Sequence, residues 1–219
     1  MRESLDQRRK RTKAFIGSLK AYYPGAHCAL VHSNPLELLV ATILSAQCTD
    51  ERVNMVTQDL FPAYPTAKSY AEADLAKLEL AIRSINFFRN KAKSLKGMGQ
   101  KLIAEHNSEV PQDLDSLVAL PGVGRKTANV VLGNAFNIAS GIVVDTHVKR
   151  LAFRLGLTKQ KVPEKVESDL LELVPKSEWV MISHLLISHG RQICKARKPS
   201  CSRCFLEARC PQKGVVDPG

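Results

Sequence analysis

The sequence of 219 residues predicts an all-α fold, and three observations carry that prediction. Aromatic residues make up only 5% of the chain, so an apolar core must consist mainly of Leu, Val, Ile and Ala. Apolar residues recur with helical spacing along most of the chain, and capping residues precede several of these segments. Only residues 141–144 have the character of a strand, and four residues cannot form a sheet.

The N-terminal half is expected to contain five helices, and its clearest start signal is Asn34 followed by Pro35. Asparagine caps a helix and proline fits its first turn, so the apolar segment after them is predicted to be a buried helix. Gly97 and Gly99 weaken the last of the five, because glycine lowers helix propensity. The five expected helices cover residues 5–22, 36–46, 50–60, 75–85 and 90–106, with Asp50 as the expected cap of the third.

The C-terminal half is expected to contain short helices on both sides of the sequence Leu-Pro-Gly-Val-Gly at 120–124. Asp145 precedes a further helix, and Gly156 is expected to end it, because glycine adopts the left-handed conformation common after helices. The remaining helices are expected over residues 148–155, 163–174 and 177–194. The sequence contains no internal repeat or long linker, and its length allows one large domain or two small ones.

The net charge of +11 is concentrated at the two ends of the chain. Residues 1–20 contain seven basic and two acidic side chains, residues 191–213 contain seven and one, and the rest of the chain is balanced. This pattern suggests contact with a polyanion, with solubilising tails as the alternative. No apolar run approaches the roughly 18 residues of a membrane helix, and no apolar signal segment follows Met1, so we expect an intracellular protein without membrane contact.

Residues 114–136 have the pattern of a helix, a tight turn and a second helix. Gly122 and Gly124 allow unusual backbone angles and close approach of a ligand, and the N–H groups at the start of the second helix favour a phosphate. Lys126 faces the positive end of that helix dipole, which favours the neutral amine of a nucleophile; a phosphate-binding lysine is the alternative. Asp145, in the sequence Val-Asp-Thr-His, is either a helix cap or a carboxylate that stabilises a cationic transition state.

Four of the six cysteines lie in the last 26 residues, with six, two and five residues between them. Disulfides are not expected in a reducing compartment, and four thiolates within 17 residues can surround one metal centre. The long spacers favour an iron–sulfur cluster over zinc, which usually takes two short knuckles, although zinc stays open. The basic loop at 195–200 has the character of a phosphate-binding loop. The expected ligands are Cys194, Cys201, Cys204 and Cys210, while Cys28 and Cys48 are expected to be small buried residues.

Taken together, these motifs resemble the endonuclease III family of helix-hairpin-helix DNA glycosylases. The resemblance rests on residues 120–131, on the Val-Asp-Thr-His sequence, on the cysteine tail and on Leu-Ser-Ala-Gln-Cys-Thr-Asp at 44–50, and it covers nearly the whole chain. It implies two helical lobes with a DNA groove between them. Residues 28–139 would form a six-helix domain that contains the hairpin, and residues 1–27 with 140–219 would form a domain around a [4Fe–4S] cluster.

The resemblance also implies a bifunctional DNA glycosylase and AP lyase of base excision repair that removes oxidised pyrimidines. The lysine matching Lys126 would attack the sugar C1′ and form a Schiff base, the aspartate matching Asp145 would support this chemistry, and β-elimination would cut the strand 3′ to the site. Gln47 would fill the gap left by the flipped base. The expected partner is double-stranded DNA with damaged pyrimidines, bound by a monomer in the cytoplasm at the nucleoid of a bacterial-type cell. Further DNA contacts are implied for Gly122, Val123, Gly124, Arg125, His147 and Lys198.

One segment departs from the family pattern, because Asn-Phe-Phe-Arg at 86–89 stands where the family commonly has a turn like Gly-Leu-Tyr-Asn. Phe87 is the expected wedge that stacks on the orphaned base; the alternative is that Phe87 and Phe88 are both core residues. An adenine-removing glycosylase is the nearest rival, but that branch lacks the hairpin lysine and carries an extra C-terminal domain, whereas this sequence has Lys126 and stops at Gly219. A non-catalytic DNA-binding module and a zinc-stapled structural protein are the rivals from other classes.

Overall fold

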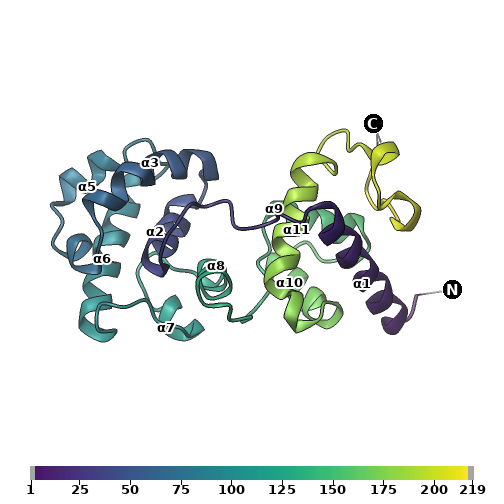
Figure 1. Cartoon of the computed structure of the whole chain (residues 1–219), viewed down its shortest axis with the longest axis horizontal. Helices are drawn as coiled ribbons and strands as arrows, with labels where there is room; N and C mark the ends of the chain where they lie inside the picture. The colour runs from purple at the N-terminus through teal and green to yellow at the C-terminus, as the bar shows by residue number, and fades with distance from the viewer. Residues whose placement is uncertain (1–2, 217–219) are drawn as a thin grey trace. The chain divides into compact units, whose positions relative to one another are not determined.

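The computed structural model describes residues 3–216, and within this range the chain is helical, with no strand (Figure 1). The prediction of an all-α fold is therefore confirmed. The chain forms two compact units, each with its own apolar core. One unit runs from Cys28 to Ser140, and the other joins the N-terminal segment up to His27 to the segment from Gly141 onward. None of the helices in the described range is long and apolar enough to cross a membrane.

The unit from Cys28 to Ser140 is built around helix α2 (Pro35–Ser45), which packs against α3 (Asp50–Ala63), α6 (Phe88–Glu105) and α8 (Arg125–Phe136). The helix starts as predicted: the Asn34 side chain accepts the Glu37 N–H at 3.0 Å, and Pro35 occupies the first turn. Its residues from Leu38 to Leu44 are all buried, so this helix is the centre of the core. The unit also contains α4 (Ala67–Ala71), α5 (Leu75–Ala81) and α7 (Leu114–Val118).

This unit differs from the sequence prediction in its short elements. Helix α4 was not predicted from the sequence. Gly99 allows α6 to pack against α4, because a Cβ at this position would lie 2.6 Å from the Ala67 carbonyl oxygen. Helix α3 is capped by Thr49 rather than by Asp50 and continues past Pro62, since a proline in the last turn removes only one hydrogen bond.

In the other unit, both parts of the chain form one core, in which α1 (Leu5–Tyr22) packs against α10 and α11 (Figure 1). Residues 141–144 do not form the predicted strand, because the described part of the unit offers no second strand for pairing. Ile142 and Val144 instead bury their side chains, and the Ile142 N–H donates to Glu167 Oε1 at 3.2 Å. The remaining helices of this unit are α9 (Thr146–Arg154), α10 (Pro163–Leu173) and α11 (Trp179–Gln192), with 3₁₀ turns η1 (Lys176–Glu178), η2 (Cys201–Arg203) and η3 (Glu207–Arg209).

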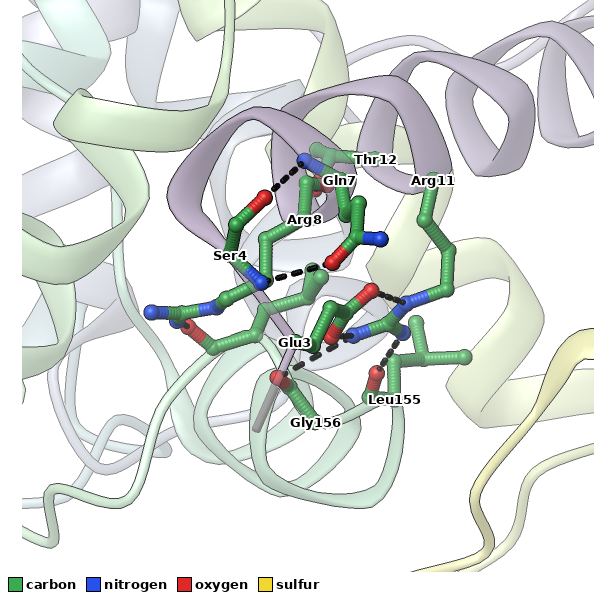
Figure 2. Close-up of polar contacts among 9 residues, drawn as sticks. Glu3, Ser4, Gln7, Arg8, Arg11, Thr12, Leu155 and Gly156 are labelled. Atoms are coloured by element: carbon green, nitrogen blue, oxygen red, sulfur yellow. Dashed lines mark hydrogen bonds and ion pairs between the residues drawn. The ribbon is translucent and has the colours of Figure 1, made fainter. Parts of the chain in front are cut away.

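Part of the N-terminal basic excess stabilises the fold. Arg8, Arg9 and Arg11 each donate to a backbone carbonyl far along the chain, at 2.6, 2.9 and 2.5 Å. Figure 2 shows Arg11 between Glu3 and the carbonyl of Leu155, the residue that ends α9. The Arg11 hydrogen bond lowers the pKa of Glu3. Because helix ends leave carbonyls without partners, these guanidinium groups anchor α1 to the ends of neighbouring segments.

Candidate functional site

The first candidate site is the hairpin formed by α7, the turn after it and α8. Leu117, Leu120 and Val123 bury their side chains, and the Val123 N–H donates to the Leu120 carbonyl at 3.1 Å. Gly122 has φ +79°, and a Cβ there would lie 2.7 Å from the Ser94 Cβ of α6, so this position requires glycine. The turn is therefore held by contacts within the hairpin: the Val123 side chain is buried, and its N–H is hydrogen-bonded to the Leu120 carbonyl.

The start of α8 is open to a ligand. Gly124 is its N-cap with φ −96°, an ordinary backbone angle, so the predicted need for a special conformation is wrong at this position. A Cβ there would meet no described atom within 4 Å, which leaves room beside the helix start. The first turn carries exposed Arg125 and Lys126, and neither an acidic residue nor a side-chain cap occurs there. A helix start without a side-chain cap, two cations and open space together favour an anion.

Asp145 is the N-cap of α9, as one of its two interpretations predicts. Its Oδ1 accepts the Val148 N–H at 2.7 Å, so the cap uses one carboxylate oxygen. His147, two residues further, packs within its own unit: its Nδ1 lies 3.2 Å from Arg150 Nη2, and a Cβ at Gly190 would lie 2.9 Å from it. Lys126 and Asp145 belong to different units.

Gln47 and Phe87 are two of the exposed residues with left-handed backbone angles in the unit from Cys28 to Ser140. Gln47 follows α2 with φ 55°, and Phe87 precedes α6 with φ 58° and is 62% exposed. Phe88 packs half-buried against the core, so the core interpretation holds for Phe88 and is wrong for Phe87. Left-handed angles are costly for residues other than glycine and cluster at functional sites.

A cavity that is partly open to solvent is lined by all four C-terminal cysteines, Cys194, Cys201, Cys204 and Cys210. Burial raises the pKa of Cys201, Cys204 and Cys210, so a bound metal centre would have to displace their protons. Within residues 3–216, no three His, Cys, Asp or Glu side chains are arranged to hold a single metal ion. The four sulfurs line one cavity. Cys28 and Cys48 lie apart from this cavity, partly buried against the other core.

Arg154, which sequence reasoning missed, organises the loop between the first two of these cysteines. Only 7% exposed, it donates from Nη1 to Cys194 Sγ at 3.3 Å and to the Lys195 carbonyl at 2.6 Å, and from Nη2 to the Ala196 carbonyl at 2.9 Å. Lys198 lies further along the same loop, exposed and with φ 49°. The available signal was an arginine in the apolar stretch Leu-Ala-Phe-Arg-Leu at 151–155.

A second polar contact reaches the cavity from α11. His189 is 2% exposed, with Nδ1 3.0 Å from the Tyr23 hydroxyl and Nε2 3.5 Å from Cys204 Sγ. Burial lowers the pKa of His189 to about 4, so this ring is neutral at pH 7. The contact links α1 to the cysteine loop, a connection that Tyr22 reinforces by stacking on Phe205 at 4.2 Å.

The fold and the hairpin define a helix-hairpin-helix protein, and comparison with known proteins agrees. Residues 40–176 match the HhH-GPD family, described as an HhH-GPD superfamily base excision DNA repair protein. Endonuclease III of Synechocystis sp. is 52% identical over 204 residues, which are 93% of each chain. A solved non-covalent endonuclease III–DNA complex has a TM-score of 0.88 at 45% identity and covers 93% of this chain and 95% of that one. A trapped endonuclease III–DNA covalent intermediate, an estranged-adenine complex, has the same TM-score and identity and covers 93% and 96%.

The chain therefore belongs to the HhH-GPD superfamily of base excision DNA repair proteins and, within it, to the endonuclease III family. As a member of that family it is a DNA-repair enzyme, a DNA glycosylase and AP lyase. The resemblance inferred from the motifs is thereby confirmed.

Proposed function

We propose that this enzyme removes oxidised pyrimidines from double-stranded DNA and then cuts the strand 3′ to the abasic site, with Lys126 as the nucleophile. The observation that carries the proposal is the position of this exposed amine, in the first turn of α8 beside the open start at Gly124. A phosphate bound by that helix start would bring the sugar of a flipped nucleotide near the amine. The 45% identical relative trapped as a covalent intermediate with DNA supports a nucleophile in this family.

The proposed reaction needs no oxidant or reductant. The lone pair of Lys126 Nζ attacks C1′ of the damaged nucleotide, and the base leaves with the electron pair of its C1′–N bond and takes up a proton. The sugar ring opens to give an imine between Nζ and C1′. Loss of a proton from C2′ then expels the 3′ phosphate oxygen, which cuts the strand, and water hydrolyses the imine to regenerate the amine.

In this proposal Asp145 has two roles on one carboxylate. Oδ1 caps α9 through the Val148 N–H and thereby fixes the side chain, and Oδ2 stabilises the positive charge that develops as the base leaves. A negative oxygen held by its own helix start costs no reorganisation during the reaction. This division of work explains how a helix cap can also serve catalysis.

DNA binding is assigned to residues of both units. The hairpin from Gly122 through Arg125 binds a phosphate beside the lesion, while Gln47 fills the gap in the duplex and Phe87 stacks on the orphaned base. Lys198 on the cysteine loop binds the backbone, and His147 contributes through the start of α9. We assign the unit from Cys28 to Ser140 as the helix-hairpin-helix domain and the other unit as the cluster domain. The enzyme works as a monomer on chromosomal DNA in the cytoplasm.

We further propose that Cys194, Cys201, Cys204 and Cys210 hold a [4Fe–4S] cluster. The fit is supported by four thiols around one cavity, by Arg154 at Cys194 and by the long spacers between ligands. When bound, the cluster supplies structural cross-linking of the C-terminal loop rather than a step of base removal. The loop between Cys194 and Cys201 is then fixed at both ends, which places Lys198 for contact with a phosphate.

The test is single-turnover base release from a duplex with one thymine glycol, compared with the same duplex carrying normal thymine, each with and without sodium borohydride. We expect release and a covalent adduct only from the damaged duplex. Equal binding of both duplexes without any adduct would contradict the proposal and would favour a non-catalytic DNA-binding module.

A further inference from the structure

Lys91 is a buried cation that the proposed chemistry does not use. It is 7% exposed, in the second turn of α6, and burial lowers its pKa. Its Nζ donates to two backbone carbonyls, those of Leu44 at 2.8 Å and Ala46 at 2.6 Å. Burying an ammonium group costs free energy unless it is well hydrogen-bonded. The two hydrogen bonds to carbonyls offset this cost, so we ask what Lys91 holds in place.

The two carbonyls lie where α2 ends, directly before Gln47. The last carbonyls of a helix lack partners within the helix and form the negative end of its dipole, which a cation stabilises. Glycine is the usual residue for the left-handed turn that follows, but here Gln47 adopts it, with φ 55°. Lys91 therefore fixes the end of α2 from which the Gln47 loop departs.

A second contact holds the same loop from the turn before α6. Asn86 Nδ2 donates to the Gln47 carbonyl at 2.7 Å, and Asn86 directly precedes the exposed, left-handed Phe87. Residues 86–91 thus carry Phe87 together with both donors that hold the backbone around Gln47.

We infer that Lys91 and Asn86 are positioning residues that hold Gln47 and Phe87 in one preformed clip and thereby favour duplex over single-stranded substrate. This inference rests on the proposed roles of Gln47 and Phe87. Filling a gap and stacking on an orphaned base stabilise the flipped state only where a second strand is present. A clip ordered before binding loses less conformational freedom when it enters the duplex.

The test compares single-turnover cleavage of an abasic-site strand, once in a duplex and once single-stranded. Lys91→Met keeps an unbranched side chain but removes both hydrogen bonds, and we expect the duplex rate to fall about tenfold or more, with the single-strand rate within about twofold of wild type. Lys96→Met is the matched control, because Lys96 on the same helix donates to the Ala73 carbonyl at 2.7 Å, and neither rate should change there. Equal losses on both substrates for Lys91→Met would overturn the inference.

Two further variants exclude a general loss of folding. Asn86→Ala removes an exposed side chain, so it should fold normally and lower only the duplex rate. In a background that carries both Gln47→Ala and Phe87→Ala, Lys91→Met should cost nothing more on the duplex, since a residue that acts through these two side chains has no effect without them. Additive losses would contradict the inference. A wild-type enzyme that cleaves neither substrate would contradict the proposed function itself, so the two failures are distinguishable.

Discussion

Arg154 Nη1 donates a hydrogen bond to Cys194 Sγ at 3.3 Å. The same guanidinium also donates to the carbonyls of the next two residues, Lys195 and Ala196. The buried guanidinium of Arg154 therefore orders both Cys194, a predicted cluster ligand, and the backbone of the loop that begins at Cys194. Arg150 adds a second guanidinium at the start of this loop, because its Nη2 donates to the Cys194 carbonyl at 3.0 Å.

Removing Arg154 should release this loop. Arg154→Met leaves three acceptors without their donor, and we expect a loss of about 3 kcal/mol in the free energy of unfolding together with faster loss of iron in air. Denaturant unfolding and iron content over time check this. Arg197→Met, an exposed arginine of the same loop, is the control and should behave as wild type. Unchanged iron retention in Arg154→Met would show that Arg154 does not stabilise the cluster.

The cysteine cavity should contain a cluster rather than a single ion. The purified protein is expected to be brown and to carry about four irons and four sulfides per chain. Cys204→Ser should lower iron content and solubility, whereas Cys48→Ser, in the other unit, should leave both unchanged. Stoichiometric zinc in a colourless protein would refute the cluster.

Lys198 should act through charge alone. Lys198→Ala is expected to weaken binding of damaged and undamaged duplexes alike and to lower the slope of log Kd against log salt by about one. Fluorescence anisotropy across a salt series measures both quantities. A slope equal to that of wild type would show that this loop residue makes no phosphate contact.

Asp145→Asn separates the cap from the chemistry. Asparagine caps a helix about as well as aspartate, so the melting temperature should stay close to that of wild type. The single-turnover rate of base release should fall about 100-fold or more, because the negative charge is lost. Asp113→Asn is the matched control, since Asp113 caps α7 through the Ser116 N–H at 2.8 Å and should change neither quantity. A wild-type rate of base release by Asp145→Asn would show that Asp145 serves only as a helix cap.

Much of the fold follows from local sequence signals. Asn34 with Pro35 started α2 as predicted, and Gly156 follows α9 with φ +68°. Signals that depend on distant contacts were misread: residues 141–144 have strand composition but no partner strand, and Gly99 serves packing between helices. Helix α4 was missed because five residues are too few to show a helical period.

The same limit applies to the candidate site. The four cysteines and the hairpin glycines could be found because their spacing is local in sequence. Lys91 gives no such local signal, and the apolar neighbours of Arg154 indicate burial but not its partners, because the acceptors of these two side chains include carbonyls 45 and 41 positions away. Long-range hydrogen bonds of this kind become visible only in the structure.

Lys126 as the nucleophile is the central claim, and borohydride trapping on a thymine-glycol duplex tests it most directly. Lys126→Gln keeps a long polar side chain on an exposed position, so folding and duplex binding should largely survive. Lys93→Gln, which changes an exposed lysine on α6, is the matched control and should trap DNA as wild type does. We predict that Lys126→Gln yields neither trapped adduct nor strand cleavage; near-normal trapping by this variant would contradict the account.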